Sequence, residues 1–225
     1  ISMSWGGGAP AATEQAVFDV AHNAGIALVA AAGNDNTDAL MYPASYAHII
    51  SVGASDDADL RAGFSNYGDS IDVMAPGVNI WSSVATTTSS YFFYDGTSMA
   101  CPYVSGLAAL MLSLDPNLTP TRLEQCLKET ADNIDALNPG FAGQLGAGRV
   151  NAFQAVMCVP SEPLAAFSAD FFGNACAGNP IQFTDYSGGI DLSQWAWSFP
   201  GGVPASSTLQ NPVVTYAANG TYNVT

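Results

Sequence analysis

The chain has 225 residues, enough for one large domain or two modest ones, and its hydrophobic share of 48% predicts a sizeable core. Only 10% of the residues are charged, and four basic residues against 19 acidic ones give a net charge of −15. So acidic a chain repels nucleic acid and anionic membranes, and no apolar run approaches the roughly 20 residues of a membrane-spanning helix, so we expect none of these partners or topologies.

The first part of the chain alternates predicted strands and helices. Residues 1–4 look like part of a buried strand that has already begun at residue 1. The chain opens without a Met or a basic signal sequence, so we expect it to be an internal piece of a longer protein. Residues 13–25 are predicted to form a helix with Thr13 as its N-cap and Gly25 at its end. Continuous apolar runs, typical of buried parallel strands, occupy residues 26–34, 48–55 and 70–77.

Three further helices complete this part. Residues 98–114 form an apolar run rich in small residues, with Pro102 in the first turns, where a missing amide costs least. Thr119 and Pro120 mark the next helix start, and residues 149–157 read as a last short helix. Strands that alternate with helices predict an α/β domain with a parallel sheet.

The composition changes at residues 158–167, where two prolines and a short polar patch indicate a linker. Beyond it, short strands with alternating aromatics are separated by Gly, Pro and Asn turns, the pattern of a β-sandwich. Trp195, Trp197 and Phe199 fall on one strand face at a period of two. We expect core aromatics, and the alternative is a platform on which a ligand stacks.

The four cysteines are Cys101, Cys126, Cys158 and Cys176, and no pair has the C-x-x-C spacing of a zinc site. Four cysteines allow three complete pairings. Cys126 and Cys158 lie in two predicted helices near the end of the first domain, so this pair is the favoured disulfide. Cys101 lies in an apolar segment beside Ser98, and we expect it to be a small buried residue.

Ser98 is the candidate nucleophile. Gly96 lets the backbone approach closely, and Ser98 then stands at a helix N-terminus, where free amides favour the negative charge of an acyl-transfer intermediate. The common alternative is a helix-capping serine. The longer string GTSMACPYVSG, residues 96–106, resembles the nucleophile segment of the subtilases, which typically reads G-T-S-M-A-x-P-H-V-x-G. The departure is Tyr103, where the family usually has a histidine that is not the catalytic one.

Two further segments resemble subtilase motifs in family order. SMSWGG, residues 2–7, is similar to a strand that pairs with extended substrate, which implies that Ser4, Trp5 and Gly6 line the substrate cleft. Trp5 replaces a smaller aliphatic residue common in the family, so specificity is expected to differ.

VAAAGN, residues 29–34, resembles the segment that carries the oxyanion donor, which here is Asn34. The same resemblance makes Ala31, Ala32 and Gly33 a wall of the pocket for the residue before the cut bond. For Asn34 alone, the alternative is a turn residue after a strand. Some members bind a cation through backbone carbonyls of a loop like residues 44–49, so calcium is a cofactor that the resemblance allows and no side chain indicates.

A base for Ser98 is missing from the chain. The family's histidine stands in an H-G-T-x-V-A-G segment and its aspartate in a D-[ST]-G segment, both before the nucleophile. His22 and His48 match neither context and are expected to be surface or strand-edge histidines, and no D-[ST]-G tripeptide occurs. We therefore expect the chain alone to be inactive, with its triad partners in a preceding segment.

The tail resembles a PKD domain, an immunoglobulin-like sandwich, in the segments PIQFTDYSGG, WAWSFPGG and NPVVTYAANGTYNVT. The expected organisation is a subtilase catalytic portion over residues 1–158, a linker over 159–166 and a truncated PKD domain over 167–225. The implied fold class is α/β, a three-layer subtilisin-like parallel sheet with helices on both faces and its N-terminal part missing, followed by a partial all-β sandwich.

The resemblance implies a secreted bacterial serine endopeptidase that acts on proteins or peptides. One alternative is a non-catalytic relative with a binding or adhesion role and a decayed triad. Another is that the PKD-like part, elsewhere a spacer or a module for insoluble substrates, is the functional unit and contacts matrix or polysaccharide. Without preceding strands, residues 1–4 are also expected to present an exposed apolar edge that favours aggregation.

Overall fold

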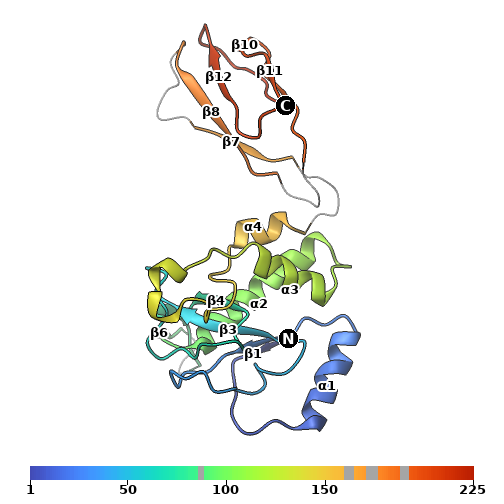
Figure 1. Cartoon of the computed structure of the whole chain (residues 1–225), viewed down its shortest axis with the longest axis vertical. Helices are drawn as coiled ribbons and strands as arrows, with labels where there is room; N and C mark the ends of the chain where they lie inside the picture. Colours follow the sequence, from blue (N-terminus) through green and yellow to red (C-terminus); the bar gives the residue numbers. More distant parts are fainter. Residues whose placement is uncertain (86–88, 160–164, 171–176, 188–192) are drawn as a thin grey trace. The chain divides into compact units, whose positions relative to one another are not determined.

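The computed structural model describes residues 1–85, 89–159, 165–170, 177–187 and 193–225. The chain divides into two compact units, Ile1–Val159 and Pro160–Thr225 (Figure 1). Residues 160–164 of the predicted linker lie outside the described residues.

A parallel four-stranded sheet organises the first unit. Its order is β1-β2-β3-β4, and every neighbouring pair is parallel. The bounds are Ser2–Met3 for β1, Val29–Ala31 for β2, Ile50–Ser55 for β3 and Val73–Pro76 for β4. The strands β2 and β3 are buried along their whole length, as their continuous apolar runs predict.

Helices cover both faces of this sheet (Figure 1). On one face α1 (Ala12–Asn23) packs through Phe18 against Leu28 and Ala30. On the other, α2 (Thr97–Leu114) packs against Val29 and Ala31, together with α3 (Pro120–Glu129) and α4 (Ala152–Met157). Alternate residues at β2 thus pack into two hydrophobic cores, one on each face of the sheet. This arrangement confirms the three-layer α/β prediction for this unit.

The helix α2 is the central helix of the unit, since it contacts all four strands of the sheet and α4. Among the described helices it is also the one long and apolar enough to cross a membrane by length and composition alone, a property that the sequence reading overlooked. Its Ala100, Cys101, Val104 and Met111 are fully buried in the protein core, which accounts for that apolar composition.

The start of α1 and the lengths of the first two strands differ from prediction. Thr13 does not cap α1; the N-cap is Ala11, whose amide donates to Tyr46 Oη at 2.7 Å. A tertiary contact therefore replaces the local cap. The strand predicted over residues 26–34 is only three residues long, and β1 has just Met3 buried. As expected, β1 forms an edge of the sheet, with Ile1 exposed.

Smaller elements complete the first unit. An antiparallel hairpin of β5 (Ile80–Ser83) and β6 (Tyr91–Tyr94) forms a two-stranded sheet of its own. Two short 3₁₀ turns, Asp135–Leu137 and Pro139–Phe141, precede α4.

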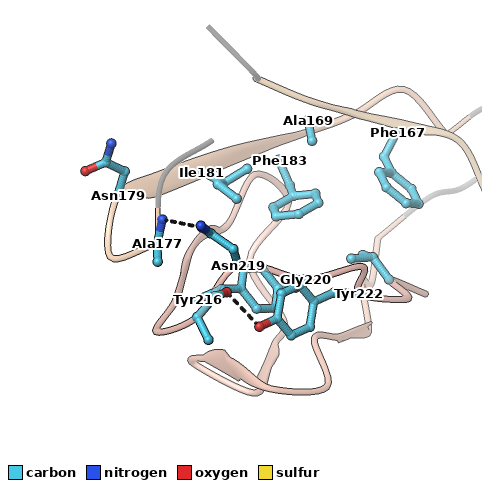
Figure 2. Close-up of a pocket in the computed structure, with 12 residues that line it drawn as sticks. Phe167, Ala169, Ala177, Asn179, Ile181, Phe183, Tyr216, Asn219, Gly220 and Tyr222 are labelled. Atoms are coloured by element: carbon cyan, nitrogen blue, oxygen red, sulfur yellow. Dashed lines mark hydrogen bonds between the residues drawn. The ribbon is translucent and has the colours of Figure 1, made fainter. Parts of the chain in front are cut away.

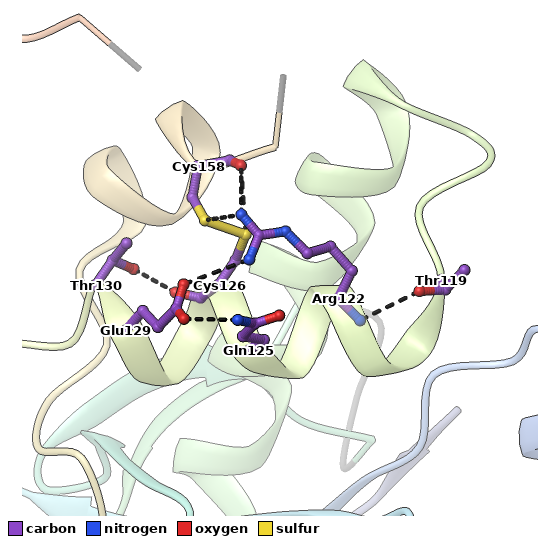
Figure 3. The surroundings of a disulfide bond; sticks show 7 residues. All are labelled: Thr119, Arg122, Gln125, Cys126, Glu129, Thr130 and Cys158. Atoms are coloured by element: carbon purple, nitrogen blue, oxygen red, sulfur yellow. Dashed lines mark hydrogen bonds and ion pairs between the residues drawn. A yellow bond between two sulfur atoms is a disulfide. The ribbon is translucent and has the colours of Figure 1, made fainter. Parts of the chain in front are cut away.

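A disulfide joins Cys126 of α3 to Cys158 after α4, which confirms the favoured pairing (Figure 3). The start of α3 is also as predicted, with Thr119 Oγ1 accepting from the Arg122 amide at 3.2 Å. The Arg122 guanidinium donates to the carbonyl and the sulfur of Cys158, so the α3–α4 corner is held by covalent and polar contacts together. Cys101 is buried and free, as expected, and Cys176 lies outside the described residues.

Removing this disulfide is expected to destabilise the first unit. The bond closes a loop with a sequence separation of 32. The chain-entropy relation then predicts that a Cys126→Ser/Cys158→Ser variant loses roughly 3–4 kcal/mol of unfolding free energy. Urea unfolding followed by circular dichroism measures the loss. An unchanged urea midpoint in the double variant would contradict the prediction, and the reduced wild-type chain is the matched control.

The second unit consists, in its described part, of strands and their connections. One sheet has the order β10-β12-β8-β7 and the other pairs β11 with β9. The bounds are Phe167–Ala169 for β7, Pro180–Asp185 for β8, Trp197–Ser198 for β9, Gly202–Val203 for β10, Ser206–Ser207 for β11 and Val213–Tyr216 for β12. Trp197 and Phe199 are buried in its core with Trp195 packed against them, as the core interpretation predicted.

Asp185 is a half-buried carboxylate that three residues of this unit hold through hydrogen bonds. Its carboxylate accepts hydrogen bonds from Trp195 Nε1 at 2.7 Å, from the Ser187 amide at 2.9 Å and from Gln210 at 3.3 Å. Burial by itself raises the pKa of Asp185, but the hydrogen bonds of Ser187, Trp195 and Gln210 outweigh it and hold the pKa below 3.8.

The second unit is therefore expected to lose stability as the pH falls. Because the folded-state pKa is depressed, the contribution of Asp185 is present above the unfolded-state pKa, about 3.9, and is lost as the pH falls through the folded-state pKa. We expect Asp185→Asn to lower the melting temperature near pH 7 and to flatten its decline in acid, measured by calorimetry. Parallel acid profiles for the variant and the wild type would show that Asp185 plays no such part.

Candidate active site

Ser98 stands in the first turn of α2, directly after a strand-to-helix connection. Gly96 precedes the helix with φ of 153°, a conformation that favours glycine, and its amide donates to the Gly77 carbonyl at 2.8 Å. Within the described chain the Ser98 amide has no hydrogen-bond acceptor, so it is one of the free donors of a helix N-terminus. The serine side chain is half-buried.

Asn34 lies beside this helix start and is held there by Thr97. Asn34 Oδ1 accepts from the Thr97 amide at 2.9 Å and from Thr97 Oγ1 at 3.0 Å. Thr97 Oγ1 in turn accepts from the Gly33 amide at 3.1 Å. Because the oxygen is occupied, the Asn34 amide is oriented with Nδ2 as a donor that has no acceptor among the described residues. Nδ2 lies 3.6 Å from where a side chain on Gly96 would begin.

Asn66 supports the loop that carries Asn34, and sequence reasoning missed it. Its buried Oδ1 accepts from the Asp35 amide at 2.9 Å, and its Nδ2 donates to the Ala32 carbonyl at 2.9 Å. Gly33, with φ of 107°, packs so closely that an added Cβ would lie 2.4 Å from Asn66 Nδ2. Asn66 thus braces the turn on which the free donor of Asn34 depends.

Ser4 and Ser98 make a reciprocal contact. Ser4 Oγ donates to the Ser98 carbonyl at 2.8 Å, and Ser98 Oγ donates to the Ser4 carbonyl at 3.3 Å. This pair ties the segment after β1 to the nucleophile turn. It also means that the hydroxyl hydrogen of Ser98 is directed at a backbone carbonyl, which cannot accept a proton at neutral pH.

A cavity of about 210 Å³ opens beside Ser98. Six of the predicted site residues line it: Trp5, Gly6, Ala31, Gly33, Asn34 and Ser98. Three lining residues were not predicted: Asp35, Met41 and Thr97. Ser4 and Ala32 are not among the lining residues. Ser4 contacts Ser98, and the side chain of Ala32 packs in the core with Ile71 and Met74. The exposed indole of Trp5 forms part of the cavity wall.

Neither histidine of the chain contacts this site. His22 and His48 stack on each other with ring centroids 4.1 Å apart, and His48 Nε2 lies 4.0 Å from Asp19 Oδ1. Among the described residues that line the cavity, Asp35 is the one ionisable side chain. The described chain therefore offers Ser98 an oriented donor and a free amide but no imidazole base.

A metal ion finds little support in the side chains. No group of three or more His, Cys, Asp or Glu residues in the described part of the chain could hold one. Calcium requires six to eight oxygen ligands, so it would depend on backbone carbonyls such as those of residues 44–49.

A cavity of about 380 Å³ lies in the second unit (Figure 2). Phe167, Ile181, Phe183 and Tyr222 are among its mostly apolar lining residues. Tyr222 Oη donates to the Ala218 carbonyl at 2.8 Å. No serine, cysteine, histidine or carboxylate is among its described lining residues, so this cavity lacks the groups for acyl transfer.

The sequence profile of the Subtilase family matches residues 1–148. Subtilisin BL of Lederbergia lenta is 38% identical over 151 residues, which are 67% of this chain and 54% of that protein. The extracellular serine proteinase of Thermus sp. strain Rt41A is 48% identical over 128 residues, 56% of this chain and 31% of that protein. The chain thus spans about half or less of these relatives.

Solved structures give the same assignment of fold. A protease from Pseudoalteromonas arctica PAMC 21717 has a TM-score of 0.64 and 35% identity, covering 70% of this chain and 50% of that one. The prenylagaramide maturation protease PagA has a TM-score of 0.61 and 27% identity, covering 72% of this chain and 60% of that one.

Proposed function

Because the chain belongs to the subtilase family, we propose that it carries the nucleophile portion of a subtilisin-type serine endopeptidase that cleaves proteins or peptides. The observation that supports this most directly is the arrangement around Ser98. A half-buried serine at a helix N-terminus lies beside an asparagine whose oxygen is fully engaged and whose nitrogen is free. Acyl transfer needs this combination of nucleophile and oriented donors.

In the proposed reaction Ser98 Oγ attacks the carbonyl carbon of the scissile peptide bond while a histidine takes its proton. Asn34 Nδ2 and the Ser98 amide donate to the oxyanion that forms. The bond to the leaving amine then breaks, the histidine returns the proton to that amine, and an acyl-enzyme on Ser98 remains. Water, deprotonated by the same base, releases the acid and restores the serine hydroxyl.

The remaining site residues are assigned to substrate binding. Ser4, Trp5 and Gly6 would pair with extended substrate, and Ala31 and Gly33 would wall the pocket for the residue before the cut bond. Ala32, which packs in the core, would support that wall from behind. Trp5 would restrict the size of the bound side chains.

The setting of the enzyme is part of the same proposal. We assign the protein to the extracellular space of a bacterium, by analogy with the extracellular proteinase of Thermus sp.. Calcium would be a structural ion held by carbonyls, and no step of the reaction would use it. The second unit, which we assign as a partial PKD domain, would be a spacer or a contact for insoluble substrate, so its removal would leave the chemistry intact.

The proposal is tested by expressing the chain within its natural polypeptide and measuring casein hydrolysis. Ser98→Ala is expected to abolish turnover, while Ser113→Ala, near the other end of α2 and exposed, leaves it unchanged. A Ser98→Ala protein that still cleaves casein would refute the nucleophile assignment.

The rival is a non-catalytic family member with a binding role, in which Ser98 would have no functional base. Its signature would be a natural polypeptide that lacks both the H-G-T-x-V and the D-[ST]-G segments and does not cleave casein.

A further inference from the structure

The second unit contains a further cavity, of about 320 Å³, in which aromatic rings lie beside a carboxylate. Phe167, Trp195 and Trp197 line it together with Asp185. Among the lining residues that the structure describes, Asp185 has the one ionisable side chain. Thr225, which bears the terminal carboxylate of the chain, lies at the same cavity. We call this cavity the Asp185 pocket.

Neutral groups hold the Asp185 carboxylate in place. Oδ1 accepts from the Ser187 amide at 2.9 Å, and Oδ2 accepts from Trp195 Nε1 at 2.7 Å and from Gln210 Nε2 at 3.3 Å. Although burial raises it, the pKa of Asp185 stays below 3.8 because of hydrogen bonds from these three residues, so the carboxylate is ionised at neutral pH. The donors carry no charge, so they orient the carboxylate without neutralising it.

The second unit has no basic side chain of its own to pair with this charge. The chain has four Lys or Arg residues and two His residues, and all six lie before residue 160, in the first unit. A half-buried carboxylate without a counter-ion loses part of its hydration and gains no ion pair in return. A cation that entered the Asp185 pocket would supply that missing interaction. The net charge of −15 would also attract cationic groups to the protein.

The walls of the pocket favour an organic cation. Indole rings attract cations more strongly than other aromatic side chains do, and Trp195 and Trp197 both line the pocket. The rings of Phe167 and Trp197 meet at 72° with their centroids 5.2 Å apart, which gives the pocket an aromatic corner. A hydrated metal ion would gain little from such walls, and no group of three or more His, Cys, Asp or Glu residues in the described chain could hold one.

The hydrogen bonds of Asp185 distinguish between the two basic side chains that proteins offer most often. A guanidinium prefers to bind both oxygens of a carboxylate at once. Oδ2 already accepts two hydrogen bonds, so this two-point contact is obstructed. An ammonium is a compact charge that needs one oxygen, and Oδ1, which accepts from the Ser187 amide, offers it a further lone pair. The apolar stem of a lysine can then lie along the indole rings.

We propose that the Asp185 pocket binds the ammonium group of lysine side chains on polypeptides, with the ammonium at Asp185 and the side-chain stem along Trp195 and Trp197. The inference rests on the proposed peptidase function for its biological meaning, since the second unit would then retain lysine-bearing protein substrates. The binding itself needs no catalysis. It can therefore be measured on the 225-residue chain, whether or not that chain cleaves peptides.

The experiment titrates the ¹⁵N-labelled chain with Nα-acetyl-lysine amide, whose ammonium is its sole charge, and follows the indole N–H signals of the tryptophans by NMR. Trp195 Nε1 donates to Asp185, so its signal, assigned with Trp195→Phe, is expected to shift and to saturate. The signals of Trp5 and Trp81, in the first unit, should stay unchanged. The Nε-acetylated form of the probe is neutral and otherwise matched, and we expect it to bind at least about tenfold more weakly.

A pair of variants tests the carboxylate itself. Asp185→Asn is expected to weaken binding of the lysine probe by the same factor, measured well below the melting temperature of the variant. Asp170→Asn removes an exposed carboxylate of the same unit that does not line the pocket, so it is the matched control and should bind like the wild type. Should Asp185→Asn fail to fold, the comparison of the two probes on the wild-type chain provides the same test.

Other results would overturn the proposal. Equal binding of the charged and the acetylated probe, or a Trp195 signal that does not shift, would show that the pocket selects no cation. Undiminished binding in Asp185→Asn would place the ammonium at the terminal carboxylate of Thr225 instead. A signal that responds to Nα-acetyl-arginine amide or to glucosamine but not to the lysine probe would identify a different ligand. Ser98→Ala must bind the lysine probe normally, so failure of the peptidase proposal would leave this result unaffected.

Discussion

The purified 225-residue chain is expected to hydrolyse casein or a peptide anilide at the background rate, with wild type and Ser98→Ala indistinguishable. Ser98 Oγ has a carbonyl as its hydrogen-bond acceptor and no imidazole beside it among the described residues. In a subtilisin, a member of this family, loss of the base histidine alone costs about 10⁶ in kcat. The oxyanion donors that remain cannot compensate for an unactivated hydroxyl.

The measurement must separate an inactive site from an unfolded protein. The Cys126–Cys158 disulfide and a cooperative urea transition serve as evidence of folding in the same preparation. A second arm supplies the base by adding a polypeptide that contains the acid and base segments of a relative. Recovery of Ser98-dependent hydrolysis in that mixture is the expected positive control. Robust hydrolysis by the chain alone, abolished by Ser98→Ala, would contradict the prediction and require a base within these residues.

The elements that local sequence signals define are those that the sequence predicted well. The helix α2 follows from one continuous apolar run, and Thr119 with Pro120 marks the start of α3 as a local cap should. The predicted start of α1 was wrong. The amide of its N-cap residue, Ala11, donates to Tyr46, which is distant in the sequence, and Thr13 is not the cap. A cap preference is a local energy of about 1 kcal/mol, which a single tertiary hydrogen bond can replace.

In the candidate site, too, residues in local sequence motifs could be predicted and a residue defined by tertiary contacts could not. Ser98 and Asn34 were identifiable because each stands in a string of several specific residues. Asn66 was not, because a polar residue in a loop resembles any turn residue until its buried contacts with the Asn34 loop are known. The side of a strand that faces a cavity also depends on the exact register, which explains why Ala31 lines the site and its neighbour Ala32 lies in the core.

Replacing Asn34 in the active peptidase, whether its acid and base come from the same polypeptide or a separate one, is expected to lower kcat by about 10²–10³ with little change in KM. That range was measured in a subtilisin. Nδ2 is a free donor in the resting structure and engages the oxygen only when charge develops on it, so ground-state binding is barely affected. Asn34→Ala and Asn34→Asp both remove the donor, and the second keeps the acceptor that Thr97 needs.

The two Asn34 variants distinguish chemistry from packing. If Asn34 only braces the loop, Asn34→Asp should be nearly active because Thr97 still has its acceptor, and Asn34→Ala should raise KM and lower stability. If Nδ2 stabilises the oxyanion, Asn34→Asp should be at least as impaired as Asn34→Ala, since it places a negative charge at the oxyanion. Asn117→Ala, at an exposed position before α3, is the control for loss of an amide side chain.

Thr97 contacts Asn34 and orients it, but in the proposed reaction Thr97 does not donate to the oxyanion itself. Thr97→Val removes the Oγ1 contact and keeps the backbone bond to Asn34 Oδ1, so we expect a smaller loss in kcat, about tenfold, with KM unchanged. Thr97→Ser retains the hydroxyl and should restore the rate. A Thr97→Val effect as large as that of Asn34→Ala, or no rescue by serine, would mean that Thr97 acts through packing of α2 rather than through the orientation of Asn34.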